Sequence, residues 1–248
     1  MRALVLAAGL GKRLKPWTLE HPKALVPVAG IPMLERVLSK LEHEGFDNIV
    51  VNIHHFGDQI VDYLKTRKSC AEISISDERG YLLDTGGGIL QADEVLKGDS
   101  PLLVHNVDIL SDASLRSLMQ GHEKSGAEVT LLTSHRASSR KLCFDSSDHL
   151  CAWIDVRSGE TKPVGCGYVA GTATEEAFSG IYIMGKDAIK RMRKWATRKA
   201  FPIMDFFLDT CGDADYRRYC IPRLRLLDIG KPDALAKAAD FVASLQER

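Results

Sequence analysis

The feature that most constrains the fold is a short apolar run near the start of the chain that leads directly into a glycine-rich, basic loop. Leu4–Leu6 form the kind of run that a parallel strand shows when both of its faces are covered. Gly9 and Gly11 follow, and glycine lets successive backbone N–H groups turn toward one point and lets a ligand approach the main chain closely. The sequence therefore predicts a buried strand whose carboxyl end opens into an anion-binding loop.

Composition narrows the class of protein. The chain has 248 residues, of which 45% are hydrophobic, enough to bury a full core in one large domain or two small ones. Lys and Arg together number 33, as do Asp and Glu, and this balance gives no overall electrostatic footprint for nucleic acid. Met1 leads directly into the first strand, and no apolar run of about 18 residues or more is present. We expect a cytoplasmic protein without a membrane or nucleic-acid partner, with its six cysteines as reduced thiols.

Strand and helix patterns alternate along the first half of the chain, which favours a doubly wound α/β layer structure. Short β-like runs between 136 and 174 indicate hairpins added to the sheet edge. The predicted fold is Rossmann-like, with a mostly parallel mixed sheet and helices on both faces. The expected helices are 31–44, 57–67, 111–124, 186–196 and 202–211, with others beginning near Gly88 and at Pro232; the expected strands are 4–6, 48–54, 72–76, 102–105, 127–133, 178–184, 217–221 and one that ends at Asp228.

The string G-x-G-x-R-L-x-P at 9–16 is followed by H-P-K-A-L-V-P-V at 21–28, which supplies Lys23. Together these motifs resemble the signature of the sugar-phosphate nucleotidyltransferases, also called nucleotide-sugar pyrophosphorylases. They differ from a Walker loop, which needs G-x-x-x-x-G-K-[ST], and from the dinucleotide fingerprint, which needs a third glycine opening a helix. The form D-T-G-G-G-I at 84–89 is most like the small bacterial uridylyltransferases that act on N-acetylmuramate 1-phosphate.

Three glycines at a helix start normally cost stability, so either a close approach by something flat or anionic, or a tight turn, explains Gly86–Gly88. The resemblance implies that this turn lies against the nucleotide base. We expect Lys23 to present an exposed ammonium in the phosphate site. The residues implied to bind the nucleotide are Ala7, Ala8, Gly9, Gly11, Lys12, Arg13, Lys23, Thr85, Gly86, Gly87 and Asn106.

Asp108 follows the strand 102–105, and ligands in open α/β sheets bind at the carboxyl ends of strands. The alternative is that Asp108 or Asp112 caps the helix 111–124, a role that suits Asp112 better. The segment that contains Asp228, Gly230 and Pro232 matches the family in these three residues. The resemblance implies that Asp108 and Asp228 hold Mg²⁺, and that Gly180, in F-S-G-I, lies near the acceptor sugar.

Charge determines the chemistry that such a site must perform. A sugar 1-phosphate is already an oxyanion near neutral pH, so its attack on the α-phosphorus of a nucleoside triphosphate needs no strong base. The protein must instead neutralise two polyanions and align them. The catalytic set we expect is Arg13, Lys23, Asp108 and Asp228.

We expect one nucleotidyltransferase domain spanning 1–248. Residues 1–135 would bind the nucleotide, 136–185 would form a sugar-side hairpin insertion, and 186–248 would close the metal site. The expected substrates are UTP and N-acetylmuramate 1-phosphate or a related hexose 1-phosphate. GTP-dependent guanylyl transfer to mannose or heptose 1-phosphate is the alternative, and a non-catalytic nucleotide-sensing subunit is an alternative of another class. The chain is expected to be a monomer or homodimer.

Overall fold

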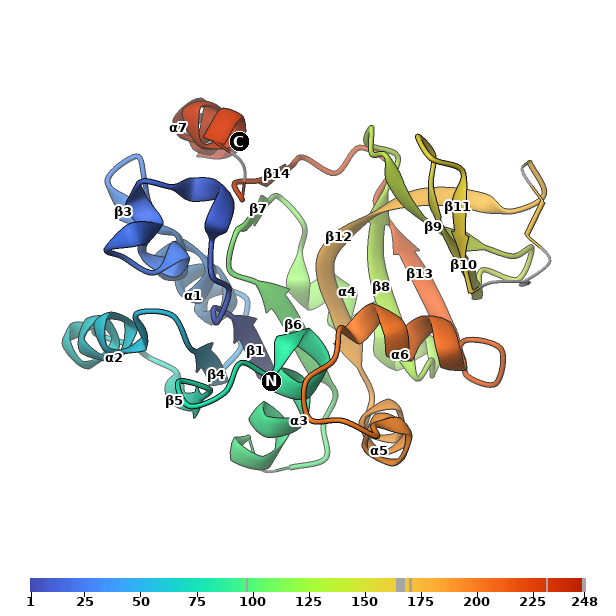
Figure 1. Ribbon diagram of the computed structural model, residues 1–248, viewed down its shortest axis with the longest axis horizontal. Helices are drawn as coiled ribbons and strands as arrows, with labels where there is room; N and C mark the ends of the chain where they lie inside the picture. Colours follow the sequence, from blue (N-terminus) through green and yellow to red (C-terminus); the bar gives the residue numbers. More distant parts are fainter. Residues whose placement is uncertain (97, 164–167, 170, 231, 247–248) are drawn as a thin grey trace.

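A computed structural model describes residues 1–96, 98–163, 168–169, 171–230 and 232–246 (Figure 1). The strands are β1 (Arg2–Leu6), β2 (Pro27–Val28), β3 (Ile31–Pro32), β4 (Asn48–Ile53), β5 (Glu72–Asp77), β6 (Leu102–Asn106), β7 (Ile109–Ser111), β8 (Val129–Ser134), β9 (Arg140–Phe144), β10 (Leu150–Asp155), β11 (Glu160–Lys162), β12 (Thr174–Met184), β13 (Tyr216–Cys220) and β14 (Leu226–Asp228). The α-helices are α1 (Met33–His43), α2 (Gly57–Thr66), α3 (Asp84–Val95), α4 (Leu115–Ser125), α5 (Lys186–Trp195), α6 (Ile203–Thr210) and α7 (Pro232–Gln246). Three 3₁₀ turns, η1 (Lys12–Leu14), η2 (Trp17–Leu19) and η3 (Lys23–Leu25), follow β1.

One mixed sheet organises the described residues. Its order is β11-β10-β9-β12-β6-β1-β4-β5, with β8 paired to β12 and β13 paired to β8. The strands β6, β1, β4 and β5 are parallel, whereas β12 runs antiparallel to β6, β8 and β9. The strands β9 to β11 extend the sheet beyond β12 as hairpins, on the right of Figure 1. The predicted fold class, including this edge insertion, is confirmed.

Helices cover both faces of the parallel strands, because alternate residues of each strand point to opposite sides. Ala3 and Val5 pack with α1, α2 and α4 in one buried cluster, whereas Leu4 packs with α3, α5 and α6 in a second. The strands therefore read as continuous apolar runs, since each is buried on both faces. Among the described residues, no helix is both long and apolar enough to cross a membrane.

Two predicted helix starts are wrong by four residues. The helix expected from near Gly88 begins instead at Asp84, so the three glycines lie inside α3. The helix expected over 111–124 begins at Leu115, because 109–111 form β7 and pair with β14. Its N-cap is Ser114, whose hydroxyl accepts from the N–H of Ser117 at 3.1 Å. The alternative that made Asp112 the cap is therefore wrong.

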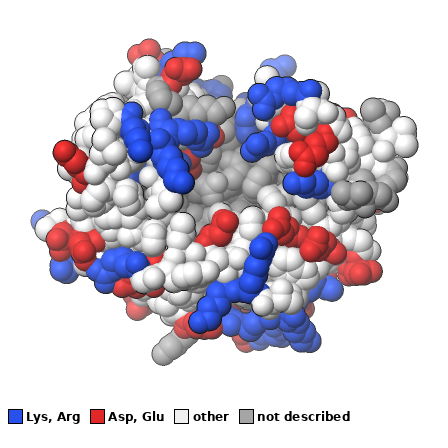
Figure 2. Space-filling view, viewed as in Figure 1, with Lys and Arg blue, Asp and Glu red and all other residues white. Residues whose placement is uncertain are grey.

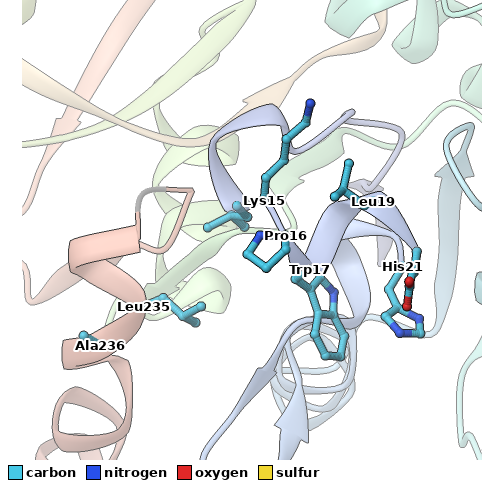
Figure 3. A pocket seen from close by; sticks show the side chains of 9 residues that line it. Lys15, Pro16, Trp17, Leu19, His21, Leu235 and Ala236 are labelled. Atoms are coloured by element: carbon cyan, nitrogen blue, oxygen red, sulfur yellow. The ribbon is translucent and has the colours of Figure 1, made fainter.

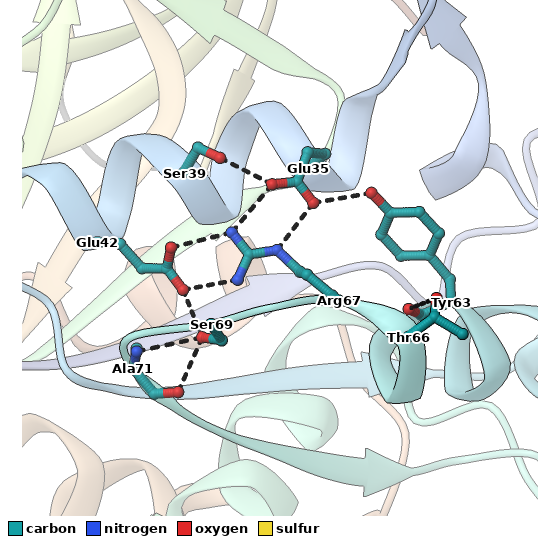
Figure 4. Close-up of polar contacts among 8 residues, drawn as sticks. All are labelled: Glu35, Ser39, Glu42, Tyr63, Thr66, Arg67, Ser69 and Ala71. Atoms are coloured by element: carbon teal, nitrogen blue, oxygen red, sulfur yellow. Dashed lines mark hydrogen bonds and ion pairs between the residues drawn. The ribbon is translucent and has the colours of Figure 1, made fainter.

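A polar network outside the sheet joins α1 to the end of α2 (Figure 4). The Arg67 guanidinium, only 5% exposed, donates to both Glu35 and Glu42. These hydrogen bonds hold the pKa of Glu42 below its ordinary value. Burial raises the pKa of Glu35, but bonds from Arg67, Tyr63 and Ser39 leave it lowered on balance. The network satisfies a buried cation and fixes α1 to the end of α2.

Candidate active site

The carboxyl ends of β1 and β6 meet at one edge of the sheet, since the two strands pair in parallel with Leu6 beside Asn106. Asp108 follows β6 and forms an ion pair with Lys23, which begins η3. Their side chains are only 13% and 14% exposed, respectively. The prediction that Lys23 presents an exposed ammonium is therefore wrong, because Asp108 holds it in a largely buried position.

Four functional groups converge around the turn that follows β14. A Cβ built on Gly230 would lie 2.8 Å from Asp108 Oδ2, 2.9 Å from Asp228 Oδ1 and 2.9 Å from Arg13 Nη2. The Gly230 N–H donates to Asp228 Oδ1 at 2.8 Å, and the N–H of Ile229 donates to the Asp108 carbonyl at 3.0 Å. Segments distant in sequence thus bring Arg13, Asp108 and Asp228 to one point, with Lys23 bound to Asp108. Only glycine leaves room for them.

The glycine loop after β1 has one open position. A Cβ on Gly9 would meet nothing within 4 Å, and the residue is exposed. Gly11 adopts φ +61°, and a Cβ there would lie 2.7 Å from Thr18 Cγ2. Gly11 is thus needed for its left-handed backbone and its close packing. Lys12 and Arg13 are exposed in η1 directly behind it.

The two alanines before the loop bind a side chain of the protein. Asn52 Oδ1, at the end of β4, accepts from the N–H groups of Ala7 at 2.6 Å and Ala8 at 3.1 Å. Asn52 Nδ2 donates to Glu78 Oε1 at 2.7 Å. Both alanine N–H groups are therefore engaged within the protein, and a nucleotide contact through Ala7 and Ala8 stays a prediction. Sequence reasoning missed Asn52, although a polar residue near the carboxyl end of a buried strand is a signal that could have found it.

Glu78 supports the same corner of the site. It is 1% exposed, accepts from Asn52 and also accepts from the N–H of Leu83 at 3.0 Å. Burial raises the pKa of its carboxyl group. A Cβ on Gly88 would lie 2.7 Å from Glu78 Oε1, so the first turns of α3 rest directly on this carboxyl group.

The glycines of α3 have a packing partner within the chain. A Cβ on Gly86 would overlap the Phe201 ring, and one on Gly87 would overlap the Lys199 carbonyl oxygen. The Gly86 N–H donates to the Phe201 carbonyl at 2.9 Å, and the Thr85 hydroxyl accepts from the N–H of Ile203 at 2.8 Å. The close approach inferred from the sequence is therefore made by the 199–203 segment. Thr85, Gly86 and Gly87 are therefore each in contact with the 199–203 segment.

Asn106 and Gly180 lie in contact on neighbouring antiparallel strands, β6 and β12. Gly180 adopts φ +78°, and a Cβ there would lie 2.7 Å from Asn106 Nδ2. The pairing of β12 with β8 is irregular between Phe178 and Tyr182, which includes this glycine. The residue expected near the sugar thus adjoins the one expected near the nucleotide.

A cavity of about 570 Å³ opens between the hairpin strands β9 and β10 and the charged cluster, by which we mean Arg13, Lys23, Asp108 and Asp228. Figure 2 shows Lys and Arg side chains gathered on both sides of a hollow in this face of the molecule. The charged residues that line the cavity are Arg13, Arg136, Arg140, Lys141, Arg157 and Asp228. Sequence reasoning missed Arg136, although it follows β8 at the same edge of the sheet.

A second cavity, of about 670 Å³, lies between the 14–21 segment and α7 (Figure 3). Leu14 lines it and also packs with Ile229, Ala238 and Val242 in a small buried cluster. This cluster fixes α7 and the turn before it against the loop that carries Arg13.

The donor set at Gly230 suits Mg²⁺. Two carboxylate oxygens, from Asp108 and Asp228, lie within 3 Å of one point. Mg²⁺ takes oxygen ligands and is usually held by one or two carboxylates together with phosphate oxygens and waters. The residues present therefore fit such an ion.

The chain belongs to the nucleotidyl transferase family, which it matches over residues 2–244. It is 44% identical over 174 residues to N-acetylmuramate alpha-1-phosphate uridylyltransferase of Caulobacter vibrioides, an alignment that covers 65% of this chain and 71% of the relative. The protein of the same name from Neisseria meningitidis is 40% identical, over 48% of this chain and 52% of the relative. Mannose-1-phosphate guanylyltransferase of Mycobacterium tuberculosis is 27% identical, over 98% of this chain and 65% of the relative. The predicted class, a sugar-1-phosphate nucleotidyltransferase, is confirmed.

Solved structures agree on the fold. A putative glucose-1-phosphate thymidylyltransferase from Bacillus anthracis superposes with a TM-score of 0.80 at 15% identity, covering 100% of this chain and 96% of that one. UDP-glucose pyrophosphorylase from Acinetobacter baumanii gives a TM-score of 0.77 at 15% identity, covering 100% and 94%. At this identity the two structures bear on the fold alone.

Proposed function

We propose that the chain transfers uridine monophosphate from UTP to N-acetylmuramate 1-phosphate or a related hexose 1-phosphate and releases pyrophosphate. The observation that carries this proposal is the convergence of Arg13, Asp108 and Asp228 at Gly230, with Lys23 paired to Asp108. The choice of substrates is supported by the two uridylyltransferases at 44% and 40% identity.

In the proposed reaction a phosphate oxygen of the sugar 1-phosphate attacks the α-phosphorus of UTP. A bond forms between that oxygen and the α-phosphorus, and the bond from the α-phosphorus to the oxygen that bridges to the β-phosphate breaks. The electron pair of the broken bond leaves with pyrophosphate, and no proton transfer is required. The protein contributes alignment and charge neutralisation.

Each charged residue has a proposed part. Arg13 and the amides of Gly9 and Gly11 would bind the β- and γ-phosphates, with Lys12 beside them. Lys23 would face the α-phosphate or the sugar phosphate. Asp108 and Asp228 would hold Mg²⁺, which when bound supplies charge neutralisation to the phosphates. Thr85, Gly86 and Gly87 would lie near the base, Asn106 near the ribose and Gly180 near the sugar.

The proposal also assigns parts of the chain. Residues 1–135 would bind the nucleotide, 136–185 would enclose the sugar, and 186–248 would complete the metal site within one domain. UTP and sugar phosphates are cytoplasmic metabolites, which supports a cytoplasmic protein, as a monomer or homodimer.

Guanylyl transfer to mannose 1-phosphate is a second candidate, because a relative of that name aligns over 98% of this chain. A non-catalytic subunit is less well supported, because it would be expected to lack one of the four converging charged residues.

The test is a pyrophosphate-release screen of four nucleoside triphosphates against a panel of sugar 1-phosphates with Mg²⁺, repeated with a chelator. UTP with an N-acetylated hexose 1-phosphate should give the highest rate. A tenfold preference for GTP, about 1.4 kcal/mol in transition-state binding, would favour the second candidate. Release that is absent from every pair would favour the non-catalytic subunit. Asp108→Asn is the control for contaminating enzyme.

A further inference from the structure

One cation that lines the 570 Å³ cavity has a charge and a hydrogen-bond donor that the described residues only partly satisfy. Arg136 lies between β8 and β9 and is half-buried. Its Nη2 donates to the Phe178 carbonyl at 2.7 Å. Its Nε is buried and has no hydrogen-bond partner among the described residues. Burial lowers the pKa of this guanidinium, an effect that the Asp228 carboxylate partly offsets. A half-buried guanidinium with an unsatisfied donor is stabilised by an anion placed beside it.

The other cations that line the cavity from β9 and from the end of β10 are already paired. Arg140 and Arg157 both lie 3.7 Å from Asp155, and Lys141 lies 3.2 Å from Glu175. Arg140 and Arg157 are also well exposed, at 70% and 75%, so water screens them. Of these four cations, Arg136 is therefore the one whose charge and donors are least satisfied within the described residues.

Arg136 reaches the cavity from a different part of the chain than Arg13 and Lys23, the cations assigned to the phosphates. Arg13 and Lys23 come from the segment after β1, on the left of Figure 1, whereas the β8–β9 connection that carries Arg136 lies on the right. Arg136 is bonded instead to β12, two residues before Gly180, on the side of the cavity assigned to the sugar. A neutral hexose offers no anion there, whereas a hexose that carries a carboxylate does.

We propose that Arg136 binds a carboxylate substituent of the acceptor sugar and so selects acidic sugar 1-phosphates over neutral ones. This inference rests on the proposed function. It assigns the acceptor's specificity to one side chain, whose guanidinium offers the planar donor pair that a carboxylate accepts.

The test is calorimetric titration of the whole chain, with Mg²⁺, against three acceptors. They are N-acetylmuramate 1-phosphate, the same compound with its carboxylate converted to a carboxamide, and N-acetylglucosamine 1-phosphate, which lacks the lactyl group. Wild type should bind the acid at least tenfold more tightly than either neutral compound. Arg136→Met should lose that preference while binding the neutral compounds within about threefold of wild type, and Arg136→Lys should keep part of it. Arg157→Met, at the exposed rim, is the matched control and should behave like wild type.

Two results would overturn the inference. One is that the wild-type protein binds the acid and the two neutral compounds with equal affinity. The other is an equal loss for all three compounds in Arg136→Met, since this would make Arg136 a phosphate contact or a structural residue. Pyrophosphate release, followed in parallel, separates this inference from the proposed function. Turnover without charge preference would retain the enzyme class and reject the role of Arg136. Charge-selective binding that Arg136→Met abolishes, without turnover, would support that role and reject the proposed reaction.

Discussion

Asp108 and Asp228 each place one carboxylate oxygen within 3 Å of the point where a Cβ of Gly230 would lie. Two like charges so close repel each other unless a cation lies between or beside them. Lys23 pairs with Asp108, and Arg13 Nη2 lies 2.9 Å from the same point. The cluster therefore carries two positive and two negative side chains, and these are the groups that the proposed Mg²⁺ and its anionic substrates would contact.

If one Mg²⁺ needs both carboxylates, losing either removes most of the charge neutralisation that brings two anionic substrates together. Asp108→Asn and Asp228→Asn should each lower kcat/KM by roughly a hundredfold or more, about 3 kcal/mol in the barrier. The double variant should be little worse than either single one, because residues that act as a unit are not additive. Additive losses at saturating Mg²⁺, or a near-normal rate in either single variant, would reject the shared-metal assignment.

Lys23→Met should slow turnover strongly and should also change stability. It leaves the largely buried Asp108 carboxylate without its ion pair and close to Asp228. We expect a melting temperature several degrees lower without Mg²⁺, with Mg²⁺ restoring more stability to this variant than to wild type. Lys65→Met, which removes an exposed pair with Asp62, is the control and should melt normally. Equal Mg²⁺ effects on wild type and Lys23→Met would show that the ion does not bind at Asp108.

Gly230→Ala should impair activity more than folding. The added methyl group would press on Asp108 Oδ2, Asp228 Oδ1 and Arg13 Nη2, and so move the proposed metal ligands apart. We expect kcat/KM to fall at least tenfold, because small misplacements of catalytic groups are costly. Gly212→Ala is the matched control, since its Cβ would meet nothing within 4 Å. A Gly230→Ala protein with normal kinetics would mean that the cluster can rearrange freely.

Gly86→Ala tests whether the glycines of α3 are needed for packing. The methyl group would overlap the Phe201 ring and would lie 2.9 Å from the Phe201 carbonyl oxygen. We expect a loss of about 2 kcal/mol or more in the free energy of unfolding, measured by urea denaturation without nucleotide. Gly80→Ala, which faces open space, should cost little. If Gly86→Ala were fully stable but no longer bound nucleotide, the glycines would be needed for contact with the base and not for packing.

Apolar periodicity predicted most of the strands and helices, because it is a local signal. The convergence of Arg13, Asp108 and Asp228 was predicted from the resemblance to the family together with the positions of Asp108 and Asp228 at strand ends. The sequence could not show that Phe201 is the group approaching Gly86, since that contact joins segments far apart in the chain. It placed the start of a helix at 111, inside β7, because β7 forms only by pairing with β14. Arg136 and Asn52 were missed for a related reason. Each lies at or just after the end of an apolar strand, as Asp108 does. Only the folded chain shows that Arg136 lines the cavity and that Asn52 binds the N–H groups of Ala7 and Ala8.

Arg67 lies between Glu35 and Glu42, away from the site (Figure 4). Arg67→Met leaves two partly buried carboxylates without their cation and should cost about 3 kcal/mol at pH 7. Both carboxyl groups have pKa values below the ordinary 4.5 in the folded protein. Their contribution is therefore present above pH 4.5 and is lost as the pH falls through the lower folded values.

The difference in unfolding free energy between wild type and Arg67→Met should accordingly shrink as the pH is lowered from 7 to about 3. Urea denaturation at several pH values measures it, provided that the folded state persists in acid. Tyr63→Phe is a useful second variant. It removes only the hydroxyl that donates to Glu35 at 2.7 Å, and its cost should be nearer 1 kcal/mol. A pH-independent loss in Arg67→Met would show that the arginine stabilises the α1–α2 junction through the packing of its stem and not through its charge.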